Sequence, residues 1–266
     1  MASMSEPAAV GRASRPGVEI HYEVYGDGAP IVLVAGLGDD RLSWQPQVEG
    51  LADDHQVIVF DNRGIGKSTI VPGPYESREM AEDCHAVVEA LGLSGVTAVG
   101  SSMGGTICQY WALEHPDDIG RLVLTNTWGR REPFLEALFS HWIHLGEQGD
   151  DQGIAESLLL FCFSPEYLEA NPGAVQEFYD AERPNLEGFV AASHACRSHD
   201  VLDRLSEIEH PTLVIAGEND ILTRPQLSVE IVERIPDAEL VTLSTGHVVF
   251  WERVAEFNAL IQRFLQ

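Results

Sequence analysis

Short apolar runs alternate with helical patterns along most of this chain. The runs are rich in valine, isoleucine and leucine and are continuous, as in strands buried on both faces of a parallel sheet. The predicted strands are residues 18–25, 31–35, 56–60, 96–100, 122–125, 211–216 and 239–243. The predicted helices are residues 77–91, 104–115, 224–235 and 251–264. This alternation predicts an α/β fold with a doubly wound, mostly parallel sheet.

The alternation stops over residues 129–204, where the pattern is helical throughout. Four prolines stand near expected helix starts, namely Pro133, Pro165, Pro172 and Pro184. We therefore expect an inserted helical cap over the carboxyl ends of the strands, where open α/β sheets bind ligands. Residues 18–128 and 205–266 would form the α/β core. The small, polar stretch 1–17 would be a flexible tail.

The charge balance limits the partners that this chain can bind. It has 42 Asp and Glu residues against 16 Lys and Arg residues, a formal net charge of -26. Such a surface repels nucleic acid and anionic membranes, so we expect neither as a partner. The acidic excess fits either a solvated surface or adaptation to high salt, which screens self-repulsion. The oligomeric state is not indicated by the sequence.

Apolar stretches and cysteine spacing indicate the cellular compartment. No apolar stretch approaches the roughly 20 residues of a membrane-spanning helix, and the N-terminal segment lacks the apolar middle of a signal peptide. We therefore expect a cytoplasmic protein. The cysteines are widely spaced, with no CxxC pair, so we expect free thiols rather than disulfides. They are Cys84, Cys108, Cys162 and Cys196.

Residues 100–104 read Gly-Ser-Ser-Met-Gly and match the pattern G-x-S-x-G. The pattern follows a predicted strand and opens a predicted helix, which is the setting of a sharp turn that exposes a nucleophilic serine. Glycines avoid clashes in such a turn, and the helix N-terminus places partial positive charge beside the serine. This setting favours Ser102 as a nucleophile over a plain Gly/Ser turn.

A serine hydroxyl needs an adjacent base to become a good nucleophile. His247 follows the last predicted strand and precedes the last predicted helix, so we expect it to be the base. Asp220 follows the strand at 211–216 and is the expected acid, with Glu218 as the alternative. The order serine, acid, histidine is the one that accompanies this serine turn.

Two backbone amides should bind the oxyanion that forms when the serine attacks a carbonyl. Met103, directly after the serine, would supply one N–H, and Leu37 in the glycine loop after the strand at 31–35 would supply the other. We expect no metal and no organic cofactor. The candidates for lining the substrate pocket are Gly36, Trp44, Trp128, Phe139 and Trp142. For apolar residues of the insertion, a place in its own core is the alternative.

Residues 61–68 end in Gly-Lys-Ser and partly match a phosphate-binding P-loop. Asp61 occupies the position of the first required glycine, which puts a carboxylate where phosphate would bind. Pro72 and Pro74 interrupt the helix that should follow. We therefore expect no nucleotide at this segment.

Taken together, these motifs resemble the α/β-hydrolase superfamily over nearly the whole chain. The matching positions are, in order, 36–38, 61–68, 100–105, Asp220 and His247. Residues 101–116 and 247–257 look most similar to the branch of 3-oxoadipate enol-lactonases and cofactor-free haloperoxidases. The resemblance implies that Ser102, Asp220 and His247 form a catalytic triad under a cap. It also implies that residues 61–68 form a structural turn.

One position departs from the family pattern. Many relatives have a histidine before the first glycine of the oxyanion loop, and this chain has Ala35. The oxyanion donor is a backbone amide, so the function should survive, but the hydrogen bonds that support the loop must differ.

These residues predict a serine hydrolase that cleaves a small, partly apolar ester, lactone or thioester through an acyl-enzyme. Perhydrolase or haloperoxidase-like chemistry, or hydrolysis of a C–C bond, with the same triad is an alternative. A non-catalytic ligand-binding protein on this fold is an alternative of another class.

Overall fold

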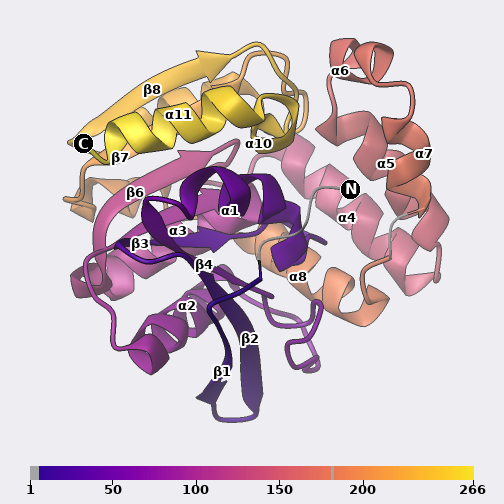
Figure 1. Ribbon diagram of the computed structural model, residues 1–266. Helices are drawn as coiled ribbons and strands as arrows, with labels where there is room; N and C mark the ends of the chain where they lie inside the picture. Colours follow the sequence, from indigo (N-terminus) through magenta and orange to yellow (C-terminus); the bar gives the residue numbers. More distant parts are fainter. Residues whose placement is uncertain (1–5, 181–182) are drawn as a thin grey trace.

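The computed structural model describes residues 6–180 and 183–266, which form an eight-stranded sheet with the order β1-β2-β4-β3-β5-β6-β7-β8 (Figure 1). The strands are β1 (Ala9–Arg15), β2 (Val18–Tyr25), β3 (Ala29–Val34), β4 (His55–Phe60), β5 (Val96–Ser101), β6 (Ile119–Thr125), β7 (Thr212–Gly217) and β8 (Ala238–Leu243). Strand β2 is antiparallel to β1 and β4, and the remaining neighbours pair in parallel. The predicted α/β fold with a mostly parallel sheet is confirmed.

Helices cover both faces of the sheet. Those outside the region between β6 and β7 are α1 (Gln45–Leu51), α2 (Ser77–Leu91), α3 (Met103–Glu114), α9 (Pro225–Val232), α10 (Val249–Glu252) and α11 (Val254–Phe264). Side chains alternate along a strand, so Ile31 and Leu33 of β3 pack with α1 and α11, whereas Val32 and Val34 pack with α2 and α3. Burial of both sets explains why the strand is apolar without interruption.

A helical insertion separates β6 from β7. It consists of α4 (Pro133–Glu147), α5 (Asp151–Cys162), α6 (Pro165–Ala170), α7 (Ala174–Asp180) and α8 (Leu186–Ser198). Figure 1 shows α4 to α7 gathered on one side of the sheet. Trp142 of α4 and Phe189 of α8 pack with ring centroids 6.4 Å apart, within the core. Across the described residues, every helix is too short or too polar to cross a membrane.

The N-terminal segment corrects one prediction. Residues 1–17 were expected to be a flexible tail, but Ala9–Arg15 is strand β1, paired with β2 in register from Ala9 opposite Val24 to Arg15 opposite Val18. Only Ala13 in this strand is buried, so backbone hydrogen bonds rather than apolar side chains hold it. A polar edge strand of this kind has no hydrophobic pattern to reveal it. Residues 1–5 lie outside the described residues.

Several boundaries also differ from the expected ones. The helix expected at 224–235 ends at Val232, and the one expected at 251–264 is two helices, α10 and α11, which meet at Arg253. Short 3-10 turns complete the structure at Arg41–Trp44, Pro116–Asp118 and Leu202–Glu207. The four cysteines are free thiols, as predicted.

Candidate active site

Ser102 lies between β5 and α3 in a conformation that few residues adopt. Its φ is 55° and its ψ is -117°, in a region that costs an ordinary residue of order 1–3 kcal/mol. A side chain on Gly100 would collide with the backbone of Gly104, and one on Gly104 would collide with the carbonyl of Val34. The glycines therefore allow the tight strand-to-helix turn, and the half-buried serine stands at its apex.

His247 and Asp220 form a buried pair. Asp220 follows β7 and His247 follows β8, so both lie at the carboxyl edge of the sheet, as Ser102 does. His247 Nδ1 lies 2.8 Å from Asp220 Oδ2, which fixes the ring through its N–H and leaves Nε2 for proton transfer. Asp220 also accepts hydrogen bonds from the Leu222 and Thr223 amides and the Thr223 hydroxyl, at 2.7–2.9 Å. Glu218, the alternative acid, is exposed.

Asn126 connects the loops that carry this pair, and the sequence did not identify it. Its Nδ2 donates to the carbonyls of Gly246, at 3.1 Å, and His247, at 2.6 Å. Its Oδ1 accepts from the Gly217 amide at 2.9 Å. Asn126 has a φ of 46°, a left-handed conformation that asparagine tolerates better than most residues. One buried amide side chain therefore joins the end of β7 to the loop that carries His247.

Glu252 fixes the histidine loop to the helical insertion. Its carboxylate accepts from the Ser164 amide and hydroxyl, both at 2.7 Å, and from the Gly246 amide at 3.2 Å. The His247 amide in turn donates to the carbonyl of Cys162 at 2.8 Å. The segment between α5 and α6 is therefore part of the wall around the buried pair.

The two predicted oxyanion donors flank Ser102 in the expected elements. Met103 is the first residue of α3, so its amide has no intrahelical acceptor. Leu37 lies in the loop after β3, where the position of a Cβ on Gly36 would be 3.5 Å from Ser102 Cβ. Asn62 Nδ2 donates to the carbonyl of Ala35 at 3.1 Å. This bond supports the loop at Ala35.

Residues 61–68 brace the loop that leads into α1. Fully buried Asp61 accepts from the Arg41 amide at 2.9 Å, the Arg41 guanidinium at 3.2 Å and the Lys67 amide at 2.8 Å. Arg63 pairs with Asp83 of α2 at 2.6 Å. These internal contacts occupy the groups that a phosphate would need, consistent with the expectation of a structural turn.

The aromatic pocket candidates are core residues instead. Trp44 packs on Phe250 at 4.5 Å between ring centroids, and Trp128 packs on Phe139 at 5.4 Å. Trp44, Trp128, Phe139 and Trp142 are each 1% exposed or less. The structure therefore places these four side chains in the core, away from any open surface. Gly36 is the pocket candidate that lies beside Ser102.

A surface hollow of about 490 Å³ lies elsewhere, between α8, the end of α4 and the loop at Gly73 and Pro74. Its lining includes Leu186, Val190 and His194, and none of the predicted catalytic residues. This hollow is therefore separate from the predicted catalytic residues.

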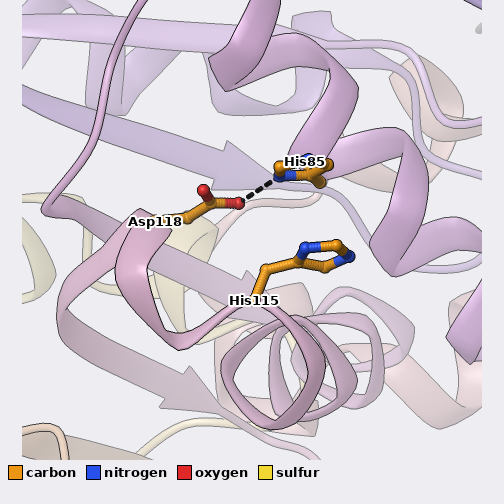
Figure 2. A group of neighbouring side chains, drawn as sticks. All are labelled: His85, His115 and Asp118. Atoms are coloured by element: carbon orange, nitrogen blue, oxygen red, sulfur yellow. Dashed lines mark hydrogen bonds and ion pairs between the residues drawn. The ribbon is translucent and has the colours of Figure 1, made fainter.

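One cluster contains residues that bind metals in other proteins (Figure 2). His85 Nδ1 lies 2.8 Å from Asp118 Oδ2, and His115 Nε2 lies 2.7 Å from Glu82 Oε1. The two imidazoles stack, with centroids 3.9 Å apart and planes at 9°. Zinc needs nitrogen lone pairs aimed at one point about 2.0–2.1 Å away, whereas stacked rings aim theirs along parallel planes. The arrangement fits hydrogen bonds that join α2 to the end of α3.

Comparison with known proteins agrees with this architecture. Residues 29–254 match the family described as alpha/beta hydrolase fold. A protein of Caulobacter segnis named "Putative carbamate hydrolase RutD" is 32% identical over 257 residues, which cover 93% of this chain and 96% of the relative. A hydrolase from Pseudomonas aeruginosa PA01 has a TM-score of 0.90 at 30% identity, covering 97% of this chain and 98% of that one. The enol-lactonase from Burkholderia xenovorans LB400 also has a TM-score of 0.90, at 28% identity, with 96% and 99% covered. The chain therefore belongs to the α/β-hydrolase family.

Proposed function

We propose that this chain is a serine hydrolase that cleaves a small, partly apolar ester, lactone or thioester through an acyl-enzyme. The observation that carries the proposal is the buried 2.8 Å pair of His247 and Asp220 at the same sheet edge as the strained Ser102 turn. A strained serine on a strand-to-helix turn and an oriented histidine are the two parts that serine nucleophilic catalysis needs.

The mechanism follows from these groups. His247 removes the proton from the Ser102 hydroxyl as its oxygen attacks the substrate carbonyl carbon. The amides of Leu37 and Met103 donate hydrogen bonds to the oxyanion. Asp220 holds the histidine tautomer and stabilises the imidazolium, which then protonates the leaving group. Water, deprotonated by His247, attacks the acyl-enzyme and releases the acid and the serine.

Carbamate hydrolysis is the second candidate, and the names of relatives such as the Caulobacter segnis protein favour it. A carbamate carbonyl is open to the same attack, with an amine or alcohol as the leaving group. Perhydrolysis by the same acyl-enzyme, in which peroxide replaces water, and C–C bond hydrolysis stay alternatives that substrate assays separate.

A fluorophosphonate probe tests the nucleophile directly. We expect it to label the folded protein at Ser102, and to label Ser101→Ala, a matched change one residue away, but not Ser102→Ala. A panel of p-nitrophenyl esters, lactones, thioesters and carbamates of graded length, run on the same variants, identifies the substrate class. Absence of labelling and turnover in the folded wild-type protein would leave the non-catalytic binding protein as the better account.

A further inference from the structure

Asp39 places a carboxyl group beside the predicted nucleophile. It directly follows the oxyanion loop 36–38. The position of a Cβ on Gly36 would lie 3.2 Å from Asp39 Oδ2 and 3.5 Å from Ser102 Cβ. The carboxyl oxygen and the nucleophile's side chain therefore approach the same point, on the same side of the loop.

No contact within the protein accounts for this carboxyl group. Among the described residues, the Asp39 side chain makes neither a hydrogen bond nor an ion pair. Its neighbours in the loop have structural partners, since Asp40 accepts from the Leu42 amide at 2.8 Å and Arg41 pairs with Glu23 at 2.6 Å. A half-buried carboxyl without a protein partner is costly unless a ligand pairs with it.

The groups around Asp39 give it a largely negative electrostatic environment. Burial raises its pKa to about 7, the charge of Asp40 adds to this, and His247 opposes it. From the helical insertion, the thiol of Cys162 faces both Asp39 and Asp220, and burial holds its pKa well above the ordinary value. Of these neighbours, Asp40 and Cys162 offer Asp39 no positive charge, and His247 is the one that can carry it.

We propose that Asp39 is a specificity-determining residue, which binds a cationic amine on the substrate and rejects substrates with a carboxylate in that place. The proposal rests on the proposed hydrolase function and narrows its substrate class to compounds with an amine near the scissile carbonyl. An ammonium group supplies the hydrogen bonds and the charge that the Asp39 carboxylate lacks. A substrate carboxylate meets a like charge in a partly desolvated site.

Three esters of matched size test the proposal. Methyl butanoate, methyl 3-aminopropanoate and monomethyl succinate differ in ending the acyl chain with a methyl, an ammonium or a carboxylate. We expect wild-type kcat/KM at about pH 8 to favour the cationic over the anionic ester by about tenfold or more. Asp39→Asn should remove most of that ratio, whereas Asp54→Asn, which deletes an exposed carboxylate elsewhere, should retain it. Butanoylcholine and its neutral isostere 3,3-dimethylbutyl butanoate test the same preference when the positive charge lies in the alcohol part of the ester instead of the acyl part.

A second readout needs no variant. Between about pH 8 and about pH 6 the wild-type ratio should fall as Asp39, whose pKa is raised to about 7, takes up a proton. A ratio near one in both series, or a ratio unchanged by pH and by Asp39→Asn, would overturn the role of Asp39. If methyl butanoate is not turned over and the fluorophosphonate does not react, the proposed function itself has failed, and this proposal with it.

Discussion

Asn126 offers the sharpest test of how the site is held together. Asn126→Ala removes three hydrogen bonds, to Gly246, His247 and Gly217, and leaves their buried backbone groups without a partner. At about 1 kcal/mol each, their loss should lower the free energy of unfolding by about 3 kcal/mol. Alanine at a φ of 46° adds about 1 kcal/mol of backbone strain. Asn126→Gly avoids that strain and isolates the contribution of the hydrogen bonds.

Urea unfolding, followed by tryptophan fluorescence, measures the stability of both variants, and ester hydrolysis measures kcat. We expect losses of about 4 kcal/mol for alanine and about 3 kcal/mol for glycine, with a fall in kcat because the loop that carries His247 shifts. Asn171→Ala, at an exposed helix end, is the control and should cost less than about 0.5 kcal/mol. A loss under about 1 kcal/mol in both Asn126 variants, with wild-type kcat, would refute this role of the side chain.

Three further predictions concern carboxylates. Asp220→Asn should lower kcat by about 10³- to 10⁴-fold, because His247 loses its oriented, negatively charged partner. A urea titration of the same variant should show that it is folded. A kcat near that of the wild type would contradict the proposed triad. Glu252→Gln removes one of the two oxygens that accept hydrogen bonds from Ser164 and Gly246. It should lower the free energy of unfolding by about 1–3 kcal/mol and reduce kcat. Urea unfolding and ester hydrolysis measure these two effects. Burial alone would raise the pKa of Glu23, but hydrogen bonds from His21, Arg41 and Tyr25 lower it to about 2 from 4.5. The ionised carboxylate therefore stabilises the fold by about 3 kcal/mol above pH 4.5, and this contribution disappears as the pH falls toward about 2. Urea titrations at several pH values in that range should show that the free energy of unfolding falls more steeply with decreasing pH in the wild type than in Glu23→Gln. Equal slopes in the two proteins would count against the lowered pKa of Glu23.

Much of the fold could be predicted because its signals are local. Strands β3 to β7 are apolar runs in the sequence because their side chains are buried on both faces of the sheet. The turn at Ser102 was predictable for the same reason, since its glycines and its neighbouring strand and helix are contiguous in sequence. Strand β1 was not predicted, because backbone pairing with β2 rather than burial of apolar side chains stabilises it.

The sequence by itself determined the order of strands β2 to β8 and the candidate residues Ser102, Asp220 and His247. Only the tertiary structure decided which distant groups meet. Asn126 reaches across 120 residues to Gly246, and Glu252 crosses 88 residues to Ser164. Tertiary packing also enclosed Trp44 and Trp128 in the core and left Asp39 beside Ser102, the predicted nucleophile. The physical reason is that hydrogen bonds, burial and charge act over a few ångströms in space, whereas a sequence pattern records only neighbours along the chain.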